Sequence, residues 1–282
     1  MNDIFNIKRF GQYLASDIKD AAHNCGLSLL LLGCSGLLIS LAGALYGLVF
    51  HGVWDMPGYT ARYGISMILL LSASITLPIK CYGHITDKKR GTAFILTPAS
   101  ALEKSLSMII VAGVLVPLLV VVIYFGLDAL TVRVFPDMGE PLLNLKAFQS
   151  SPLYASMLSS AGENWSPEFM EQMDAFTSFF LGFGWLLVKY LTNALVFLLG
   201  AIVFKKQKGA KTILSMIVLG MLFSVIQTPA TMLSKGYSDM VNSQLAAESL
   251  FESLTQWVKV ATIVFPVLLC GGIFYRVKTI KH

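Results

Sequence analysis

Six long runs of apolar residues limit this chain to a fold embedded in a membrane. The runs cover about 27–50, 63–82, 105–134, 175–204, 212–232 and 258–275, and a transmembrane helix needs about 20 mainly apolar residues. Only 13% of the 282 residues are charged, whereas soluble domains carry about a quarter. We therefore predict an all-α polytopic integral membrane protein with six transmembrane helices, in which residues 1–282 form a single transmembrane domain.

The distribution of lysine and arginine predicts how these helices are oriented. Fifteen of the 21 basic residues lie in 1–26, 80–104, 205–211 and 276–282. Because cytoplasmic segments are enriched in these residues, we expect both termini in the cytoplasm and the connections 135–174 and 233–257 outside the cell. The net charge of +5 is spread along the flanks of the apolar runs. This favours contact with anionic membrane lipids over nucleic acid, in a multi-pass protein of the bacterial inner membrane.

The segment ahead of the first apolar run has the pattern of an amphipathic helix. Within residues 4–24, Ile7, Leu14 and Ile18 recur at helical spacing, with charged residues between them. Such a pattern predicts an N-terminal helix that lies in the membrane interface. The alternative interpretation is a solvated tail.

Motifs for catalysis or cofactor binding are not found in the sequence. There is no G-x-x-x-x-G-K-[ST] nucleotide loop, no H-E-x-x-H zinc helix and no G-x-S-x-G nucleophile elbow. Cys25, Cys34, Cys81 and Cys270 lie in or beside apolar runs, so we expect small packing residues and not a disulfide framework. The sequence thus predicts a protein without enzymatic activity and without a cofactor.

One charged residue lies deep within an apolar run. Lys189 is midway along 175–204, and Asp128 near the end of 105–134 is expected at a similar depth. A charge within a membrane usually has a partner or a function, so we predict an intramembrane pair between Lys189 and Asp128. The alternatives are a lysine that reaches toward the interface alone and a charge that faces a substrate.

The connection between the second and third runs has the clearest local signals. A proline at position 98 disfavours helix at Thr97 and favours a helix that starts at Pro98, and Ser100 with Glu103 has the spacing of a capping box. Ahead of this break, 87–96 can form a short helix with a basic start at 88–90 and an apolar end at 94–96. The alternative interpretation is a charged loop in the interface.

This stretch resembles the exporter-type (type V fold) permease subunits of the ATP-binding cassette transporter superfamily. Their cytoplasmic coupling helix is often marked by a leucine-proline-small-serine motif followed by an acidic residue, and this chain reads Leu-Thr-Pro-Ala-Ser-Ala-Leu-Glu-Lys over 96–104, with Thr97 where the family often has leucine. The resemblance implies a permease that couples a separate ATP-hydrolysing subunit to cargo movement, as a homodimer or a pair of related permeases. It implies partner coupling through Lys88, Lys89, Arg90, Phe94, Ile95, Leu96, Pro98, Ser100 and Glu103.

A second function fits the same scaffold. A polytopic membrane protein that does not transport anything, such as an assembly, sensory or immunity factor, would have the same apolar runs and no ATPase partner. The apolar runs show no clearly polar pathway, which favours this alternative.

Overall fold

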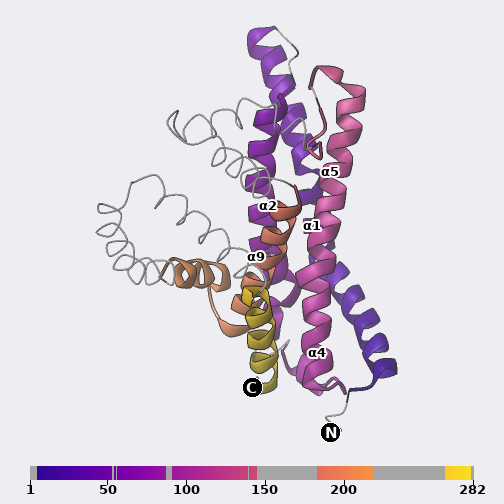
Figure 1. Ribbon diagram of the computed structural model, residues 1–282, viewed down its shortest axis with the longest axis vertical. Coiled ribbons are helices and arrows are strands. Elements are labelled where there is room, and N and C mark those ends of the chain that lie inside the picture. The colour runs from indigo at the N-terminus through magenta and orange to yellow at the C-terminus, as the bar shows by residue number, and fades with distance from the viewer. Residues whose placement is uncertain are drawn as a thin grey trace, which may run out of the picture.

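The computed structural model describes residues 5–52, 54, 56–86, 91–138, 140–144, 183–218 and 264–280, and these ranges are helical apart from turns and connections. The long helices run along one axis, and the start of the first helix lies at the same end of the molecule as the end of the last (Figure 1). We call this end of the molecule, where the α3 segment also lies, the termini end. The elements are α1 Ile7–His51, α2 Tyr59–Tyr82, η1 Gly83–Thr86, α3 Gly91–Leu96, α4 Ala101–Met108, η2 Ile109–Leu115, α5 Val116–Val134, η3 Pro136–Met138 and α9 Phe183–Val203, with further helices over Lys208–Val218 and 264–279.

Among the described residues, three helical segments are long and apolar enough to cross a membrane. They are Ile7–His51, Tyr59–Thr86 and Ala101–Val134, and a fourth is added if the bent pair Leu187–Val203 and Lys208–Val218 counts as one span. For the described ranges, the prediction of an all-helical fold with several helices able to cross a membrane is confirmed. The structure describes only part of three expected spans, 175–204, 212–232 and 258–275. Most of the expected connection 135–174 and all of 233–257 lie outside the described residues.

The expected separate interfacial helix is instead the first part of α1. Asn6 caps this helix by accepting hydrogen bonds from the backbone N–H groups of Lys8 and Arg9 at 3.0 and 3.3 Å, and the helix then continues for 45 residues. At 1.5 Å per residue it is about 67 Å long, more than twice the hydrocarbon thickness of about 30 Å. Asp17, Ala21 and Cys25 recur every four residues and are buried, so this part of α1 packs on protein.

Two close approaches bring helices together where a side chain is missing. A Cβ atom on Gly36 of α1 would lie 2.4 Å from Cε2 of Tyr124 on α5, and one on Gly200 of α9 would lie 1.9 Å from Oγ1 of Thr212. Glycine is therefore required at both contacts, because any side chain would collide with the neighbouring helix. The second contact allows the helix Lys208–Val218 to fold back at 117° to the preceding helix.

Prolines within the apolar runs change the helices without ending them. Pro78 lies inside α2, which continues to Tyr82. Pro117 has no N–H to donate, and the turns just before it form a π-helix over Ile109–Leu115 in which the N–H of Val116 donates to the carbonyl of Val111. The third expected span is thus one continuous path from α4 through α5.

Cys25 and Cys81 form a disulfide between α1 and α2, with Cα atoms 5.5 Å apart. This corrects the expectation that all four cysteines are only packing residues. Both residues are 2% exposed, and the helical spacing that buries Cys25 with Ala21 brings it to the buried face of α2. Cys34 and Cys270 are free thiols.

The far end of the bundle is closed by a buried ion pair that the sequence analysis assigned wrongly. Asp128 on α5 pairs with Arg62 on α2 at 2.5 Å, and the two side chains are 9% and 2% exposed. Arg62 also donates to the carbonyls of Met138 and Glu140 at 2.9 and 2.7 Å, while the N–H of Leu142 donates to Asp128 at 2.9 Å. These bonds hold the chain after α5 against the ends of both helices.

Lys189 therefore does not pair with Asp128. It is exposed on α9, and within the described ranges the two ion pairs are Arg9–Glu103 and Arg62–Asp128. Matched depth alone suggested the wrong partner, because it does not tell which helix lies beside α5 at that level. Arg62 in the first turn of α2 meets the carboxylate directly.

The Arg62–Asp128 pair predicts a large cost for breaking one partner. Asp128→Asn leaves the buried guanidinium uncompensated, and we expect a loss of about 3–5 kcal/mol in the free energy of unfolding. Lys189→Gln is the matched control, for which we expect a change within about 0.5 kcal/mol because the side chain is exposed. Equilibrium unfolding in mixed micelles, followed by circular dichroism, measures both. Equal costs for the two variants would contradict the assignment.

Candidate functional site

The segment between α2 and α4 has the predicted helix, break and new helix. α3 covers Gly91–Leu96, and the chain leaves helical geometry at Thr97. The next helix starts at Ala101 and not at Pro98, because Ser100 is its N-cap: Ser100 Oγ accepts from the N–H of Glu103 at 3.3 Å, and Glu103 accepts from the N–H of Ser100 at 2.8 Å. The capping box is confirmed, while Lys88, Lys89 and Arg90 lie outside the described residues.

α3 is attached to the bundle by its inner face. Phe94 is half-buried against the core, and the Nζ atom of Lys104 lies 4.9 Å from the centre of its ring and donates to its backbone carbonyl at 2.6 Å. Leu96 is 81% exposed, and Pro98 is also exposed. Of the side chains expected to contact a partner, Phe94 thus supports α3 from within, whereas Leu96 and Pro98 lie at the surface. The side chain of Ile95 is outside the description.

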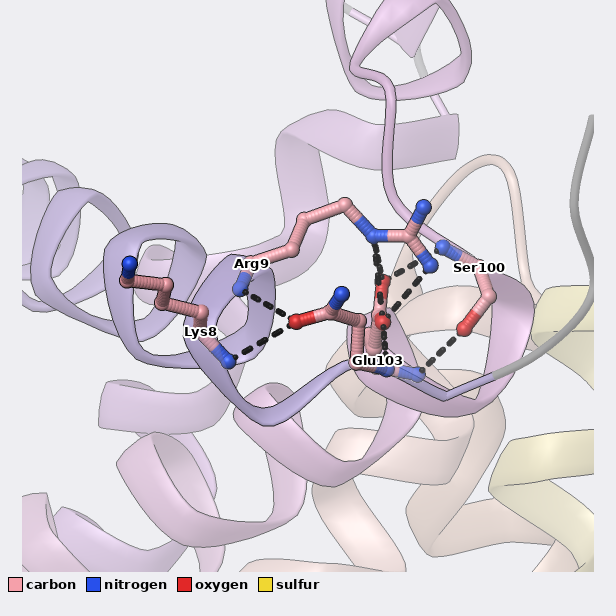
Figure 2. A network of polar contacts seen from close by, with 5 residues as sticks. Lys8, Arg9, Ser100 and Glu103 are labelled. Carbon is pink, nitrogen blue, oxygen red and sulfur yellow. Dashed lines mark hydrogen bonds and ion pairs between the residues drawn. The ribbon is translucent and has the colours of Figure 1, made fainter.

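Glu103 ties the start of α1 to the start of α4 (Figure 2). Its carboxylate accepts from Arg9 Nη2 at 2.7 Å, from Arg9 Nε at 2.9 Å, and from the N–H groups of Asn6 and Ser100 at 2.9 and 2.8 Å. These hydrogen bonds, two of them from the guanidinium, favour the ionised form of the carboxyl. The side chain of Glu103 is fully buried, which corrects the expectation that it touches a partner. It is instead a clamp between two helices, with Ser100 buried beside it.

A cavity of about 360 Å³ opens between α1, the end of α2 and the α3 segment. We call it the Asp17 pocket; its lining includes Tyr13, Asp17, Asp20, Tyr82, His84 and Phe94. The volume is in the range of small-molecule sites, about 300–1,000 Å³. The Cys25–Cys81 disulfide lies at its wall through Cys81. The pocket therefore has both charged and aromatic groups beside the α3 segment.

Asp17 is the buried acidic group of this pocket. Its Oδ2 atom accepts hydrogen bonds from the Tyr82 hydroxyl, at 2.7 Å, and from the Ser107 hydroxyl. The sequence analysis missed this residue because it counted Asp17 with the polar face of a separate helix. An available signal was its position four residues before Ala21, on the stripe that continues to Cys25.

The pocket does not have the donors of a metal centre. Within the described ranges, no three His, Cys, Asp or Glu side chains come close enough together to hold a metal ion. Its two acidic side chains, Asp17 and Asp20, are three residues apart on α1 and so lie on the same side of the helix. Such a pocket can bind a ligand of complementary charge.

The clamp predicts a dependence of stability on pH. The hydrogen bonds that Glu103 accepts from Arg9, Asn6 and Ser100 favour its ionised form. They stabilise the fold above the ordinary carboxyl pKa of 4.5 and lose this effect as the carboxyl becomes protonated at lower pH. The melting temperature of the wild type should exceed that of Glu103→Gln at pH 7, and the difference should shrink below pH 4.5.

The same measurement on Glu140→Gln provides the control, since Glu140 is exposed near the other end. Differential scanning fluorimetry in detergent micelles between pH 7 and pH 3 gives the curves. A wild-type advantage over Glu103→Gln that stays constant across this range would show that the carboxylate is not held as described.

Comparison with known proteins leaves the family of the chain open. Neither a family model, nor a curated protein, nor a solved structure matches it. Its function is therefore argued from the contacts of the α3 segment, the clamp and the Asp17 pocket.

Proposed function

We propose that this chain is the permease subunit of an ATP-driven transporter, in which a separate ATPase subunit docks on the α3 segment. The observation that carries the proposal is the two-sided character of α3. Its inner face is anchored through Phe94 and Lys104, while Leu96 at its end is 81% exposed. A docking element needs an open surface for the partner and a stiff connection to the helices that move.

That stiff connection is supplied by α4 and the Glu103 clamp. Lys104 and Glu103 both belong to α4, which continues through η2 into α5. A force on α3 is thus passed to Ala101–Val134, the most apolar of the three described spans, and, through Arg9, to the start of α1. Docking would use the exposed Leu96 and Pro98 with the basic residues 88–90, while Phe94, Ser100 and Glu103 would act as supports.

The proposal includes six spans, both termini in the cytoplasm and a place in the bacterial inner membrane. It is supported by the excess of lysine and arginine in the cytoplasmic segments. The start of α1, the α3 segment and the end of helix 264–279 also lie at one end of the molecule (Figure 1). Two permease copies, or one copy with a related chain, would form the pathway between them.

The alternative is a polytopic membrane protein that does not transport, such as a sensor or an assembly or immunity factor. The Asp17 pocket favours it, because this cavity lies at the termini end and is lined there by α1, the end of α2 and the α3 segment. A binding pocket at one end is what a sensor needs. The docking experiment separates the two functions.

Docking predicts that a surface change at α3 uncouples the partner without unfolding the bundle. A photo-reactive p-benzoylphenylalanine in place of Leu96 should cross-link to an ATP-hydrolysing subunit in native membranes, identified by mass spectrometry. Leu96→Asp should then lower the ATPase activity of the purified complex at least about tenfold, a loss of about 1.4 kcal/mol in coupling. The control variant is Leu143→Asp, at a half-exposed leucine of the far end, which should leave the ATPase activity unchanged. No cross-linked ATPase would favour the non-transport alternative.

Orientation has its own test. With Cys34 and Cys270 replaced by serine, Leu96→Cys should be protected from a membrane-impermeant maleimide in intact cells, and Leu143→Cys should be labelled. The positive-inside bias is the reason for this expectation. The reverse result would place the Cys25–Cys81 disulfide toward the oxidising side and would remove the cytoplasmic position that docking requires.

A further inference from the structure

We infer that the Asp17 pocket is a binding site for a small organic cation that carries an ammonium group, with Asp17 as its anionic partner. This inference rests on the pocket and not on the proposed transport function. It starts from a comparison of the buried carboxylates in the described part of the chain.

The carboxylates at the two ends of the bundle are neutralised by arginine, and Asp17 is not. Glu103 pairs with Arg9 and Asp128 pairs with Arg62. Asp17 is only 9% exposed, yet its described partners are the hydroxyls of Tyr82 and Ser107. His84 on the same wall also acts on Asp17 electrostatically. Because neither of the described ion pairs includes Asp17, a cationic ligand that enters the cavity would stabilise the buried carboxylate.

The second oxygen of Asp17 has no hydrogen-bond donor among the described residues. Both hydrogen bonds fall on Oδ2, so Oδ1 accepts none from the described residues, and Asp17 lines the cavity. The two hydroxyls fix the plane of the carboxylate, because they hold one of its oxygens from two helices. Oδ1 is therefore a positioned acceptor for a donor that enters the pocket.

The charge around the pocket selects a cation over an anion. Asp20 stands one turn after Asp17 at the exposed rim. Arg9 also lines the cavity, but the charge of its guanidinium is balanced by Glu103. The other titratable side chains of the lining include His84, Tyr13 and Tyr82. With Asp17 ionised by the ligand, the described residues that line the cavity carry an excess of negative charge.

The walls favour an organic cation over a metal ion. The rings of Tyr13, Tyr82 and Phe94 line the cavity, and aromatic faces attract ammonium groups. No set of metal donors comes together in the described ranges. The cavity of about 360 Å³ accommodates a short alkylamine. Soluble amines and the headgroup of phosphatidylethanolamine both carry the required group.

The test is a titration of the full-length protein in dodecyl maltoside micelles, which contain no amine. Isothermal titration calorimetry compares n-butylammonium with the neutral n-butanol and the anionic butyrate. We expect n-butylammonium to bind at least about tenfold more tightly than either of the others. Binding of n-butanol with equal affinity would show an apolar cavity only, and would overturn the inference.

Three variants locate the binding. Asp17→Asn keeps the shape and an acceptor for the two hydroxyls, and should weaken n-butylammonium at least about tenfold. Ser16→Phe fills the pocket from an exposed position of its rim, so it tests the site even if Asp17→Asn does not fold. Glu140→Gln removes one negative charge far from the pocket and should change nothing. Wild-type affinity in Ser16→Phe would place the ammonium elsewhere and overturn the inference.

Added phosphatidylethanolamine identifies the source of the ammonium group. If the lipid headgroup is the natural ligand, the lipid lowers the apparent affinity for n-butylammonium, and phosphatidylglycerol does not. If a soluble amine is the natural ligand, neither lipid changes the apparent affinity for n-butylammonium. Both results keep the Asp17 site, and they assign it to a lipid or to a soluble molecule.

Discussion

The carboxylate of Glu103 holds together the end of the molecule on which every functional interpretation depends. It accepts hydrogen bonds from Arg9, Asn6 and Ser100, and so joins the first residues of α1 to the first turn of α4. A buried carboxylate tolerates this place only because each of its oxygens is occupied and a guanidinium balances its charge. The position of α1 beside α3, and hence the shape of the Asp17 pocket, follows from this clamp.

The far end uses the same chemistry for a different purpose. Arg62 and Asp128 join α2 to α5 and also bind the chain that follows α5 through its carbonyl and N–H groups. In an apolar bundle, few directed bonds determine which helices are neighbours, because apolar side chains pack with many partners. In the described part of the chain, two arginine–carboxylate pairs, one at each end, join α1 to α4 and α2 to α5, in addition to the disulfide between α1 and α2.

The termini end then combines stiffness with open surface. Phe94 and Lys104 attach the inner face of α3 to the bundle, and its exposed end at Leu96 is available to a partner. Directly beside it lies a cavity whose buried acid, Asp17, has hydroxyl partners in the described structure. A bound cation in this cavity would contact both α1 and the wall that carries Phe94. The proposed docking surface and the proposed ligand site are thus adjacent, because Phe94 and Pro98 both line the cavity.

The amino-acid sequence by itself determined the class of fold, the break before the third apolar run and its capping box. These features depend on local rules: apolar length, the restriction that Pro98 places on Thr97, and the spacing of Ser100 and Glu103. They could be predicted because each is decided within a few residues of the chain or by composition alone.

The partners of buried charges were decided only by the tertiary structure. The sequence analysis paired Asp128 with Lys189 because the position of a residue along an apolar run indicates its depth in the membrane. At that depth, however, Asp128 of α5 meets α2, which carries Arg62. Glu103 was placed on a docking surface, since the arginine 94 residues earlier that buries it could not be foreseen. Asp17 and Cys25 were assigned to a polar helix face and to apolar packing, respectively. Both meet the end of α2 only because α1 continues unbroken from the clamp into the bundle, and long-range packing of this kind leaves no local trace in the sequence.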